Sequence, residues 1–371
     1  MNQLQKTSMP DSILIRSAMG DYQVDFWEDL SQALQLIDQC ASPLIVIDRN
    51  VARLYHDHLH TLEKRYPTLL VDALETTKTI DGVASLVTWL QENGANKKST
   101  LIAIGGGIIQ DLCAFTAHTY YRGIDWMFFP TTLLSMCDSC IGAKCGINHN
   151  QYKNQVGVFH APKRIAIVPK FLDTLDIKDV ASGYGEILKL MLTGKVADFE
   201  LLETSIEKAH GELLGSHLPA LIHRSLEIKR GVVEKDEYET DLRRILNYGH
   251  TFGHALETLS HYEVPHGLAV AWGVDLINYI GMRKGVLSEA WALRVRHFIL
   301  RHLVFEMTFT PEAYSLIEGT KKDKKAEKVL VNLILLHDSP FELKVVPQAY
   351  GDELNTWVKD YLNLPHAFSR R

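Results

Sequence analysis

Short apolar runs alternate with amphipathic segments in the first half of the chain. The apolar runs end at turn-forming residues, as buried strands do, and lie at Pro43–Asp48, Tyr66–Val71, Leu101–Ile104, Asp125–Pro130 and Arg164–Val168. Helical periodicity precedes the first of these runs, at Phe26–Gln39, and fills segments between later ones, at Ile80–Glu92 and Ile109–Tyr121. Strands that alternate with helices predict a mostly parallel sheet covered by helices.

The second half of the chain has a different pattern. Long helical periodicities dominate it, at Ser182–Leu192, Ala197–Ala209, Leu218–Glu234, Gly249–Ser260, Gly267–Lys284 and Asp352–Leu362. Two β-like runs interrupt them, Val329–Leu336 and Phe341–Val346, joined by turn residues. We therefore predict an α/β domain over residues 1–175 and a mainly α-helical domain over residues 176–371, each large enough for its own core.

Composition excludes several classes of protein. The net charge of -6 argues against general binding to nucleic acid or anionic membranes. The sequence contains no apolar run long enough for a transmembrane helix, and its first 20 residues lack the apolar core of a signal peptide. The five cysteines are an odd number, which favours reduced thiols and a cytoplasmic location. We interpret Cys137, Cys140 and Cys145 as small, partly buried residues rather than a zinc cluster, with a reactive thiol at Cys145 as the alternative.

Three glycines, Gly105 to Gly107, follow a predicted strand and precede a predicted helix. Such a loop lets backbone N–H groups approach an anion at a helix N-terminus. The spacing is not G-x-G-x-x-G, so a tight structural turn explains the glycines almost as well. Asp48, at the end of an earlier strand, is placed to bind a ribose hydroxyl or to start a turn.

Histidines and one glutamate suggest a metal site. His250 and His254 are four residues apart and share one helix face, and His266 precedes another predicted helix. Glu186 has Lys189 one turn later. Two imidazoles and a carboxylate suit zinc with an open coordination position. Thr251 stands where zinc proteases carry Glu, which argues against a protease, and spacing leaves open whether His254 is a ligand or an acid–base group.

Cationic and polar residues follow a helical spacing just before this histidine pair. Arg243, Asn247, His250 and His254 would project from one side of a continuous helix, although a solvated charged helix would also carry such residues. Arg binds carboxylates through two hydrogen bonds, and Asn and His bind phosphate oxygens. These residues predict a pocket for an anionic substrate. Further polar candidates are Lys229 and Glu239 nearby, and Asp138, Lys144, Lys153 and Asn154 in a predicted loop.

Seven segments together resemble the 3-dehydroquinate synthase family, within the sugar-phosphate cyclases. They are GGGIIQD, RGIDWMFFPTTLL, DSCIGAKCGIN, KNQVGVFHAP, GEILK, RRILNYGHTFGHALE and PHGLAVAWG, in the order and spacing of the family. The resemblance runs from about Leu44 to Val346. It implies a Rossmann-like parallel-sheet domain followed by a mainly helical metal-binding domain.

The resemblance also implies roles for individual residues. Zinc, with cobalt as a possible substitute, would be bound by Glu186, His250 and His266. NAD would be bound by Glu75, Lys78, Gly106, Gly107, Asp111, Thr131 and Thr132, joined by Asp48, Phe171 and Thr174, with Asp138, Lys144 and Lys153 near it. The substrate phosphate would be held by Lys144, Asn154, Asn247, His254 and Lys324, and by Arg122 of a second subunit in a homodimer. The substrate carboxylate would be held by Lys229 and Arg243, with Lys189 and Glu239 completing the polar site.

The implied activity converts 3-deoxy-arabino-heptulosonate 7-phosphate to 3-dehydroquinate. The family uses transient oxidation by NAD, phosphate elimination, re-reduction and an intramolecular aldol closure. Gln110, Cys140 and Cys145 depart from the usual family pattern and resemble divergent cyclases, so a cyclase for sedoheptulose 7-phosphate is an alternative. Lys229 and Arg243 favour a carboxylate-bearing substrate. A metal-dependent polyol dehydrogenase and a non-enzymatic sugar-phosphate sensor are weaker alternatives.

Overall fold

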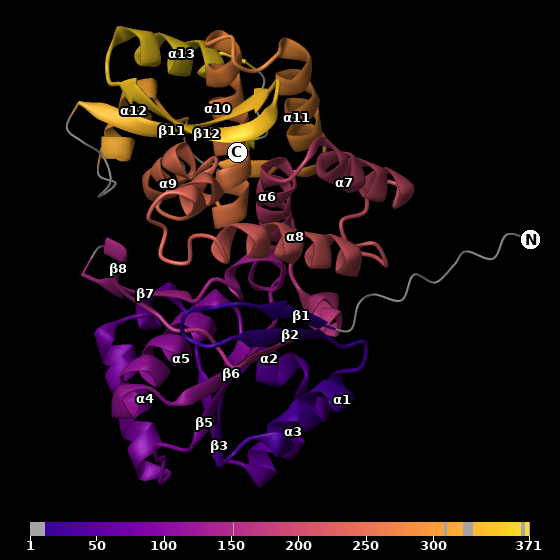
Figure 1. Cartoon of the computed structure of the whole chain (residues 1–371), viewed down its shortest axis with the longest axis vertical. Helices are drawn as coiled ribbons and strands as arrows, with labels where there is room; N and C mark the ends of the chain where they lie inside the picture. Colours follow the sequence, from indigo (N-terminus) through magenta and orange to yellow (C-terminus); the bar gives the residue numbers. More distant parts are fainter. Residues whose placement is uncertain (1–11, 151, 308–309, 322–328, 365–367, 371) are drawn as a thin grey trace, which may run out of the picture. The chain divides into compact units, whose positions relative to one another are not determined.

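The computed structural model describes residues 12–150, 152–307, 310–321, 329–364 and 368–370. Two compact units make up the chain, Met1–Leu175 and Asp176–Arg371, and each is described by itself (Figure 1).

A seven-stranded sheet forms the centre of the first unit, in the order β1-β2-β9-β6-β5-β3-β4. Its strands are β1 (Ser12–Ile15), β2 (Tyr22–Phe26), β3 (Pro43–Asp48), β4 (Thr68–Val71), β5 (Thr100–Gly105), β6 (Asp125–Pro130) and β9 (Arg164–Ile167). Every neighbouring pair is parallel except β1 and β2. All residues of β5 are buried, which explains the unbroken apolar runs, because a parallel sheet is covered on both faces. The predicted parallel sheet is confirmed.

Helices lie on both sides of these strands. They are α1 (Leu30–Leu34), α2 (Arg49–Leu54), α3 (His56–Arg65), α4 (Ile80–Glu92) and α5 (Gly107–Thr119). Figure 1 shows α4 and α5 to the left of the strands, and α1 and α3 to the right. The helix predicted over Phe26–Gln39 is shorter than expected: Phe26 ends β2, and Asp29 caps α1 by accepting a hydrogen bond from the backbone N–H of Gln32.

A β-hairpin replaces the loop that we predicted after residue 138. Strands β7 (Lys144–His149) and β8 (Tyr152–Phe159) pair antiparallel, and a short π-helix over Ser135–Ser139 precedes them. The prediction was wrong because the hairpin is largely polar and glycine-containing, and polar strands lack the apolar alternation that identifies a strand in a sequence.

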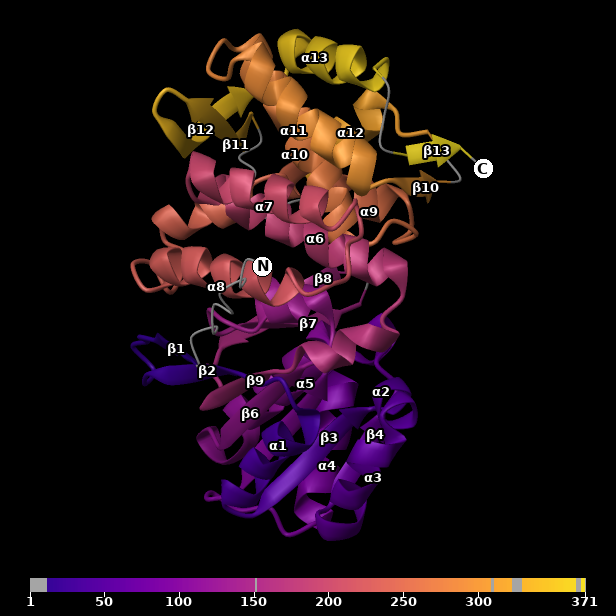
Figure 2. The same cartoon turned by 90° about the vertical axis from the view of Figure 1, so that its right-hand side faces the viewer.

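The second unit is mainly helical, as predicted. Its helices are α6 (Ile177–Thr193), α7 (Val196–Lys208), α8 (Leu218–Val233), α9 (His250–Leu259), α10 (His266–Arg283), α11 (Glu289–His302), α12 (Ala313–Lys321) and α13 (Asp352–Leu362). A hairpin joins β11 (Leu330–Asp338) to β12 (Phe341–Ala349), and short β10 (Phe305–Met307) pairs with β13 (Phe368–Arg370). Helix α10 is buried along nearly its whole length and packs against α6, α9, α11, α13 and β11 (Figure 2). None of the helices in the described part of the chain is long and apolar enough to cross a membrane.

Candidate metal and cofactor sites

Backbone contact between α6 and α10 places Glu186 beside His266. A Cβ atom added at Gly185 would lie 1.8 Å from the carbonyl oxygen of Gly267, so only glycine allows the two helices to approach so closely. The backbone N–H of Gly267 also donates to the hydroxyl of Ser182 at 3.0 Å. Glu186 follows Gly185 on α6, and His266 is the first residue of α10. The contact therefore brings a carboxylate and an imidazole from distant parts of the sequence together.

His250 begins α9, and the chain before it does not continue this helix, as a single stripe of Arg243, Asn247, His250 and His254 would require. Arg243 and Asn247 lie in a 3-10 helix, η6 (Leu242–Asn247), which is separated from α9 by two residues. The second of these, Gly249, has a φ of 78°, and a Cβ atom there would lie 2.6 Å from the carbonyl oxygen of Val270. The break is therefore imposed by packing against α10. The four side chains therefore do not lie on one continuous helix.

The structure brings Glu186, His250 and His266 together. Glu186 Oε1 lies 3.0 Å from His266 Nε2 and 3.7 Å from His250 Nε2, and Glu186 is only 2% exposed. The other carboxylate oxygen, Oε2, lies 2.6 Å from Lys189 Nζ. The two oxygens thus have separate partners: Lys189 neutralises one, and the other faces the two imidazoles.

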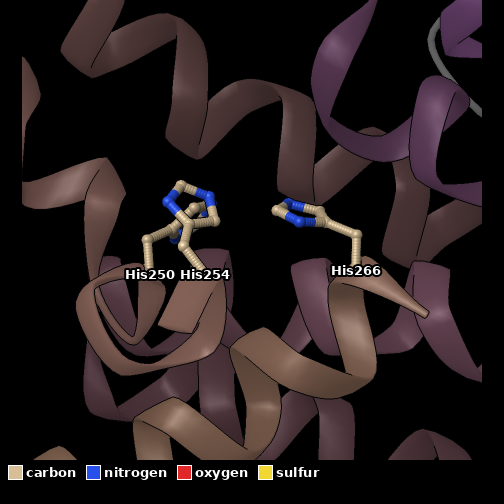
Figure 3. Close-up of side chains that lie close together, drawn as sticks. All are labelled: His250, His254 and His266. Atoms are coloured by element: carbon tan, nitrogen blue, oxygen red, sulfur yellow. The ribbon is translucent and has the colours of Figure 1, made fainter. Parts of the chain in front are cut away.

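His254 lies beside the other two histidines. Figure 3 shows His250 and His254 rising from α9 with His266 of α10 opposite them. One ring nitrogen from each of the three lies within 4.8 Å of the others. Among the residues that the structure describes, these three histidines therefore form a cluster whose nitrogens could hold a metal ion. His254 is exposed, whereas the other two are partly buried.

Hydrogen bonds to the far side of two rings fix which nitrogen faces Glu186. Nδ1 of His266 lies 3.0 Å from Glu257 Oε2, and Nδ1 of His250 lies 3.2 Å from the carbonyl oxygen of Tyr248. An imidazole whose Nδ1–H is held by an acceptor presents Nε2 to a metal. Glu257 was not singled out in the sequence, because an acid on an amphipathic helix normally indicates a solvated face.

Electrostatics at the two rings differ. Burial, reinforced by Lys189 and by the neighbouring imidazoles, holds the pKa of His250 well below its usual value, so its Nε2 carries a lone pair. Burial also disfavours the charged form of His266, but the carboxylates of Glu257 and Glu186 outweigh it and raise its pKa to about 10. A bound metal ion would displace the proton from His266 Nε2, which leaves one carboxylate oxygen and two oriented imidazole nitrogens as donors. This set fits the three-ligand arrangement of a catalytic zinc.

A second polar group surrounds η6 in the same unit. Arg243 is 3% exposed, and its guanidinium donates to the carbonyl oxygen of Glu237. Asn247 donates from Nδ2 to Glu239 Oε1 at 2.5 Å. Lys229, on α8, is 7% exposed. Burying a cation is expensive unless an anion accompanies it. An anionic ligand beside Arg243 and Lys229 would therefore be favourable.

Asp236 organises the turn that carries Arg243. Its carboxylate accepts hydrogen bonds from the backbone N–H groups of Thr240, Asp241 and Arg243, at 2.8, 2.8 and 2.9 Å, and from the Thr240 hydroxyl at 3.0 Å. The hydrogen bond from the Arg243 N–H contributes most to holding the pKa of Asp236 below its usual value, with the others adding to it. Sequence reasoning missed Asp236, because nothing in its spacing distinguishes it from the adjacent acidic residues.

The glycine loop of the first unit joins β5 to α5. Gly106 is the N-cap of α5, and Gly107 is the first residue of that helix. A Cβ atom added at Gly107 would have no atom within 4 Å. A Cβ atom at Gly106 would lie 2.9 Å from the Thr132 side chain. Thr131 is buried, and its backbone N–H donates to the carbonyl oxygen of Gly105 at 2.9 Å. The helix N-terminus, which favours an anion, and the two threonines are thus neighbours.

Asp48 ends β3 and is the N-cap of α2. Its Oδ1 accepts from the backbone N–H of Asn50 at 2.9 Å, and burial raises its pKa. Both interpretations of Asp48 are therefore compatible with its position, since one oxygen caps the helix and the residue lies at the carboxyl end of a parallel strand.

A polar network lies between η2 (Glu75–Thr77), α5 and the β7–β8 hairpin. Lys78 Nζ lies 3.0 Å from Asp111 Oδ2, 2.7 Å from Asn154 Oδ1 and 3.6 Å from Glu75 Oε1. Burial disfavours the charged amine, but Asp111 and Glu75 outweigh this and raise the pKa of Lys78. Lys153 Nζ lies 3.8 Å from Glu75 Oε2. Five predicted residues are thus brought together here.

The remaining predicted residues are dispersed. Phe171 is 2% exposed with its ring edge-on to Tyr55, and the Thr174 hydroxyl donates to that tyrosine at 3.2 Å. Asp138 is buried in the π-helix, and Lys144 is exposed at the start of β7. Arg122 is exposed in the turn after α5, with a φ of 58°. Lys324 lies outside the described residues.

The interpretation of the cysteines as packing residues agrees with their burial. Cys137, Cys140 and Cys145 are free and buried, and burial raises the pKa of the Cys145 thiol far above its usual value. A thiol in that state is a poor nucleophile.

Family models and relatives match most of the chain. Models described as 3-dehydroquinate synthase N-terminal and C-terminal match residues 68–182 and 183–326. The 3-dehydroquinate synthase of Thermoanaerobacter pseudethanolicus (strain ATCC 33223 / 39E) is 35% identical over 84% of this chain and 89% of its own length. The chain belongs to the 3-dehydroquinate synthase family. The resemblance seen in the sequence is thereby confirmed.

Two solved structures of related sugar-phosphate cyclases share the fold. ValA, the 2-epi-5-epi-valiolone synthase of Streptomyces hygroscopicus subsp. jinggangensis 5008, was solved with NAD+ and Zn2+ bound. It is 25% identical, with a TM-score of 0.80 over 94% of this chain and 98% of its own. A 2-deoxy-scyllo-inosose synthase complexed with carbaglucose-6-phosphate, NAD+ and Co2+ has 21% identity and a TM-score of 0.79 over 95% and 99% of the two chains. The latter likeness shows the fold alone.

One departure from the 3-dehydroquinate synthase pattern has a structural explanation. Gln110, on α5, is buried, and its Nε2 donates to the carbonyl oxygen of Ser139 at 2.7 Å. The Ser139 hydroxyl donates back to Gln110 Oε1 at 2.7 Å. The larger side chain therefore ties α5 to the end of the π-helix and has its polar atoms satisfied.

Proposed function

We propose that this protein converts 3-deoxy-arabino-heptulosonate 7-phosphate to 3-dehydroquinate and inorganic phosphate. The observation that carries the proposal is the convergence of Glu186, His250 and His266, in a chain 35% identical to a 3-dehydroquinate synthase over most of its length. The reaction starts and ends at the same oxidation level, so the cofactor is regenerated in each turnover.

Zinc, or cobalt in its place, would be held by Glu186 Oε1 and by Nε2 of His250 and His266. When bound, the ion supplies Lewis acidity to a substrate hydroxyl. Glu257 and the Tyr248 carbonyl oxygen accept hydrogen bonds from the Nδ1 atoms of His266 and His250. These bonds hold both rings with Nε2 toward the ion before it binds, which strengthens metal binding. Lys189 Nζ lies 2.6 Å from the second oxygen of Glu186 and neutralises its charge.

NAD would be held by residues of the first unit. The main group is Glu75, Lys78, Gly106, Gly107, Asp111, Thr131 and Thr132, with Asp48, Asp138, Lys144, Lys153, Phe171 and Thr174 as further positions. When bound, NAD supplies a reversible hydride acceptor. The N-terminus of α5 favours an anionic phosphate group, and the Phe171 position would contribute through its backbone, because its ring is packed in the core.

The substrate's two anionic groups would be bound by different residues. Arg243 and Lys229 suit the carboxylate, since they are buried cations. Lys144, Asn154, Asn247, His254 and Lys324 suit the phosphate, and Lys189 and Glu239 complete the polar site. Arg122 would reach the phosphate from a second copy of the chain, so the working enzyme would be a homodimer. Its five cysteines are free thiols, which supports work in the cytoplasm.

A substrate panel tests the proposal directly. The purified protein, loaded with zinc and NAD+, is offered 3-deoxy-arabino-heptulosonate 7-phosphate or sedoheptulose 7-phosphate, and phosphate release is measured. We expect phosphate release only with the first sugar. The product should have the mass of 3-dehydroquinate, and it should gain the ultraviolet absorbance of a conjugated enone when it is dehydrated.

Three other outcomes would contradict the proposal. Release only from sedoheptulose 7-phosphate would indicate a different cyclase of the same fold. Accumulation of NADH in proportion to product would indicate a dehydrogenase, because a cyclase returns the hydride. Tight binding of either sugar phosphate without turnover would indicate a sensor.

A further inference from the structure

Asn148 lies near the end of β7, and it is 8% exposed. Its side chain makes hydrogen bonds to Glu75, which lies 73 positions earlier in the sequence, and to Asn154, which lies 6 positions later. Nδ2 donates to Glu75 Oε1 at 2.7 Å and to the Glu75 carbonyl oxygen at 3.1 Å. Oδ1 accepts from the backbone N–H of Asn154 at 2.9 Å. Both ends of a buried amide are thus satisfied, as burial requires.

The neighbours of Asn148 allow one orientation of its amide group. Both atoms near Nδ2 are oxygens without a proton to donate, and the atom near Oδ1 is a backbone N–H. Turning the amide over would set like groups against each other at all three contacts. The backbone takes part as well: the N–H of Asn148 donates to the carbonyl oxygen of Lys78 at 2.8 Å.

These bonds fasten two separate segments to each other. One segment, around η2, carries Glu75 and Lys78; the other, the β7–β8 hairpin, carries Asn154 with a φ of 51°. Asn154 holds this unfavourable backbone conformation while its side chain accepts a hydrogen bond from Lys78. The bond from its N–H to Asn148 is one contact that stabilises the conformation.

We propose that Asn148 is a positioning residue that sets Glu75 for the cofactor and Asn154 for the substrate phosphate. This inference rests on the proposed function, which gives Glu75 and Asn154 those roles. Asn148 acts through its two neighbours: the amide N–H atoms direct the Glu75 carboxylate, and the amide oxygen directs the Asn154 backbone. Its loss would release both segments at once.

Isothermal titration with NAD+ tests the inference without turnover. The proteins are wild type, Asn148→Ala, Asn148→Asp and the control Asn93→Ala, which removes an exposed amide bonded only to its own helix at Trp89. We expect Asn148→Ala to weaken NAD+ binding by about 10-fold or more, the effect of leaving a buried polar group unsatisfied. Its KM for the sugar phosphate should rise too. The control should bind NAD+ like wild type.

Asn148→Asp fills the same space and keeps an acceptor for the Asn154 N–H. We expect it to weaken NAD+ binding at least as much as alanine does, because its second oxygen would face Glu75 Oε1. If the alanine variant does not fold, the NAD+ affinity of Asn148→Asp tests the inference in its place. Circular dichroism and the melting temperature establish which variants are folded.

Two results would overturn the inference. Folded variants that bind NAD+ and the sugar phosphate like wild type, with only a lower melting temperature, would leave Asn148 a hairpin stabiliser. If wild type itself fails to bind NAD+, the proposed function fails and the inference fails with it.

Discussion

Gly185 and Gly267 pack backbone against backbone where α6 crosses α10. A Cβ atom at Gly185 would lie 1.8 Å from the carbonyl oxygen of Gly267, and one at Gly267 would lie 1.7 Å from that of Ser182. No side chain fits at either position without moving a helix, because the clashing atoms belong to the backbone. The distance between Glu186 and His266 therefore depends on two residues that bind nothing themselves.

Gly185→Ala should separate α6 from α10 and weaken the metal site. We expect the free energy of unfolding to fall by about 1–3 kcal/mol or more, the usual cost of overpacking. Zinc content, measured by mass spectrometry of the purified protein, should fall as well. Gly231→Ala is the matched control: Gly231 is exposed inside α8 with no atom near an added Cβ, so alanine should stabilise the protein by about 1 kcal/mol. Normal zinc content in a folded Gly185→Ala variant would contradict this account of the site.

His250→Ala should abolish zinc retention and activity. The variant loses a ligand, so we expect its zinc affinity to fall by more than the ~10–100-fold typical of residues that only orient ligands. Competition with a chromophoric chelator measures the affinity. His56→Ala removes an exposed imidazole of α3 and should leave zinc binding unchanged. Full activity of His250→Ala in metal-free buffer would refute the metal assignment.

Glu257→Gln tests the orientation of His266. The amide oxygen still accepts a hydrogen bond from Nδ1, but the negative charge is lost, so His266 becomes a weaker ligand. Zinc affinity should fall by about 10–100-fold, while turnover at saturating zinc should change much less. Glu342→Gln, which removes an exposed charge paired with Lys344, is the control and should have no effect on either quantity. A variant with unchanged affinity would show that the carboxylate does not tune the ligand.

Arg243→Ala should weaken binding of the substrate carboxylate. A lost hydrogen bond to a charged group is worth about 1.5–3 kcal/mol, so kcat/KM should fall by roughly 10–150-fold. The adjacent Arg244 is exposed, and Arg244→Ala should leave kcat/KM within about twofold of wild type, as surface charges contribute little. Equal effects of the two substitutions would indicate a general loss of positive charge and not a specific contact.

Acid should release the turn around Asp236. Its folded-state pKa lies below the unfolded value of about 3.8, so the ionised carboxylate contributes stability that is present above pH 4 and is lost as the pH falls below it. Urea unfolding of wild type and Asp236→Asn across this range measures the effect. The variant should be less stable at pH 7, and the difference should shrink as the pH falls below about 4. A difference that stays constant with pH would show that the charge of Asp236 is not involved.

Much of the fold follows from local pattern. The unbroken apolar runs of β3, β5 and β6 identify buried parallel strands, because such strands are covered on both faces. Apolar periodicity likewise located α4, α8 and α13 within one residue at each end. The β7–β8 hairpin escaped prediction because its stability comes from polar contacts with distant segments, such as those of Asn148.

The candidate site divides in the same way. By itself the sequence determined the chemical types of the ligands, since residue types and their spacing are local properties of the chain. Only the tertiary structure decided that Glu186, His250 and His266 meet. It also decided that Gly249 separates the turn of Arg243 from the helix of His250. The supporting hydrogen bonds of Glu257 and Asp236 likewise appear only in the folded chain. Those relationships depend on how helices far apart in the chain pack together, and a pattern along one segment carries no record of the surface that it will meet.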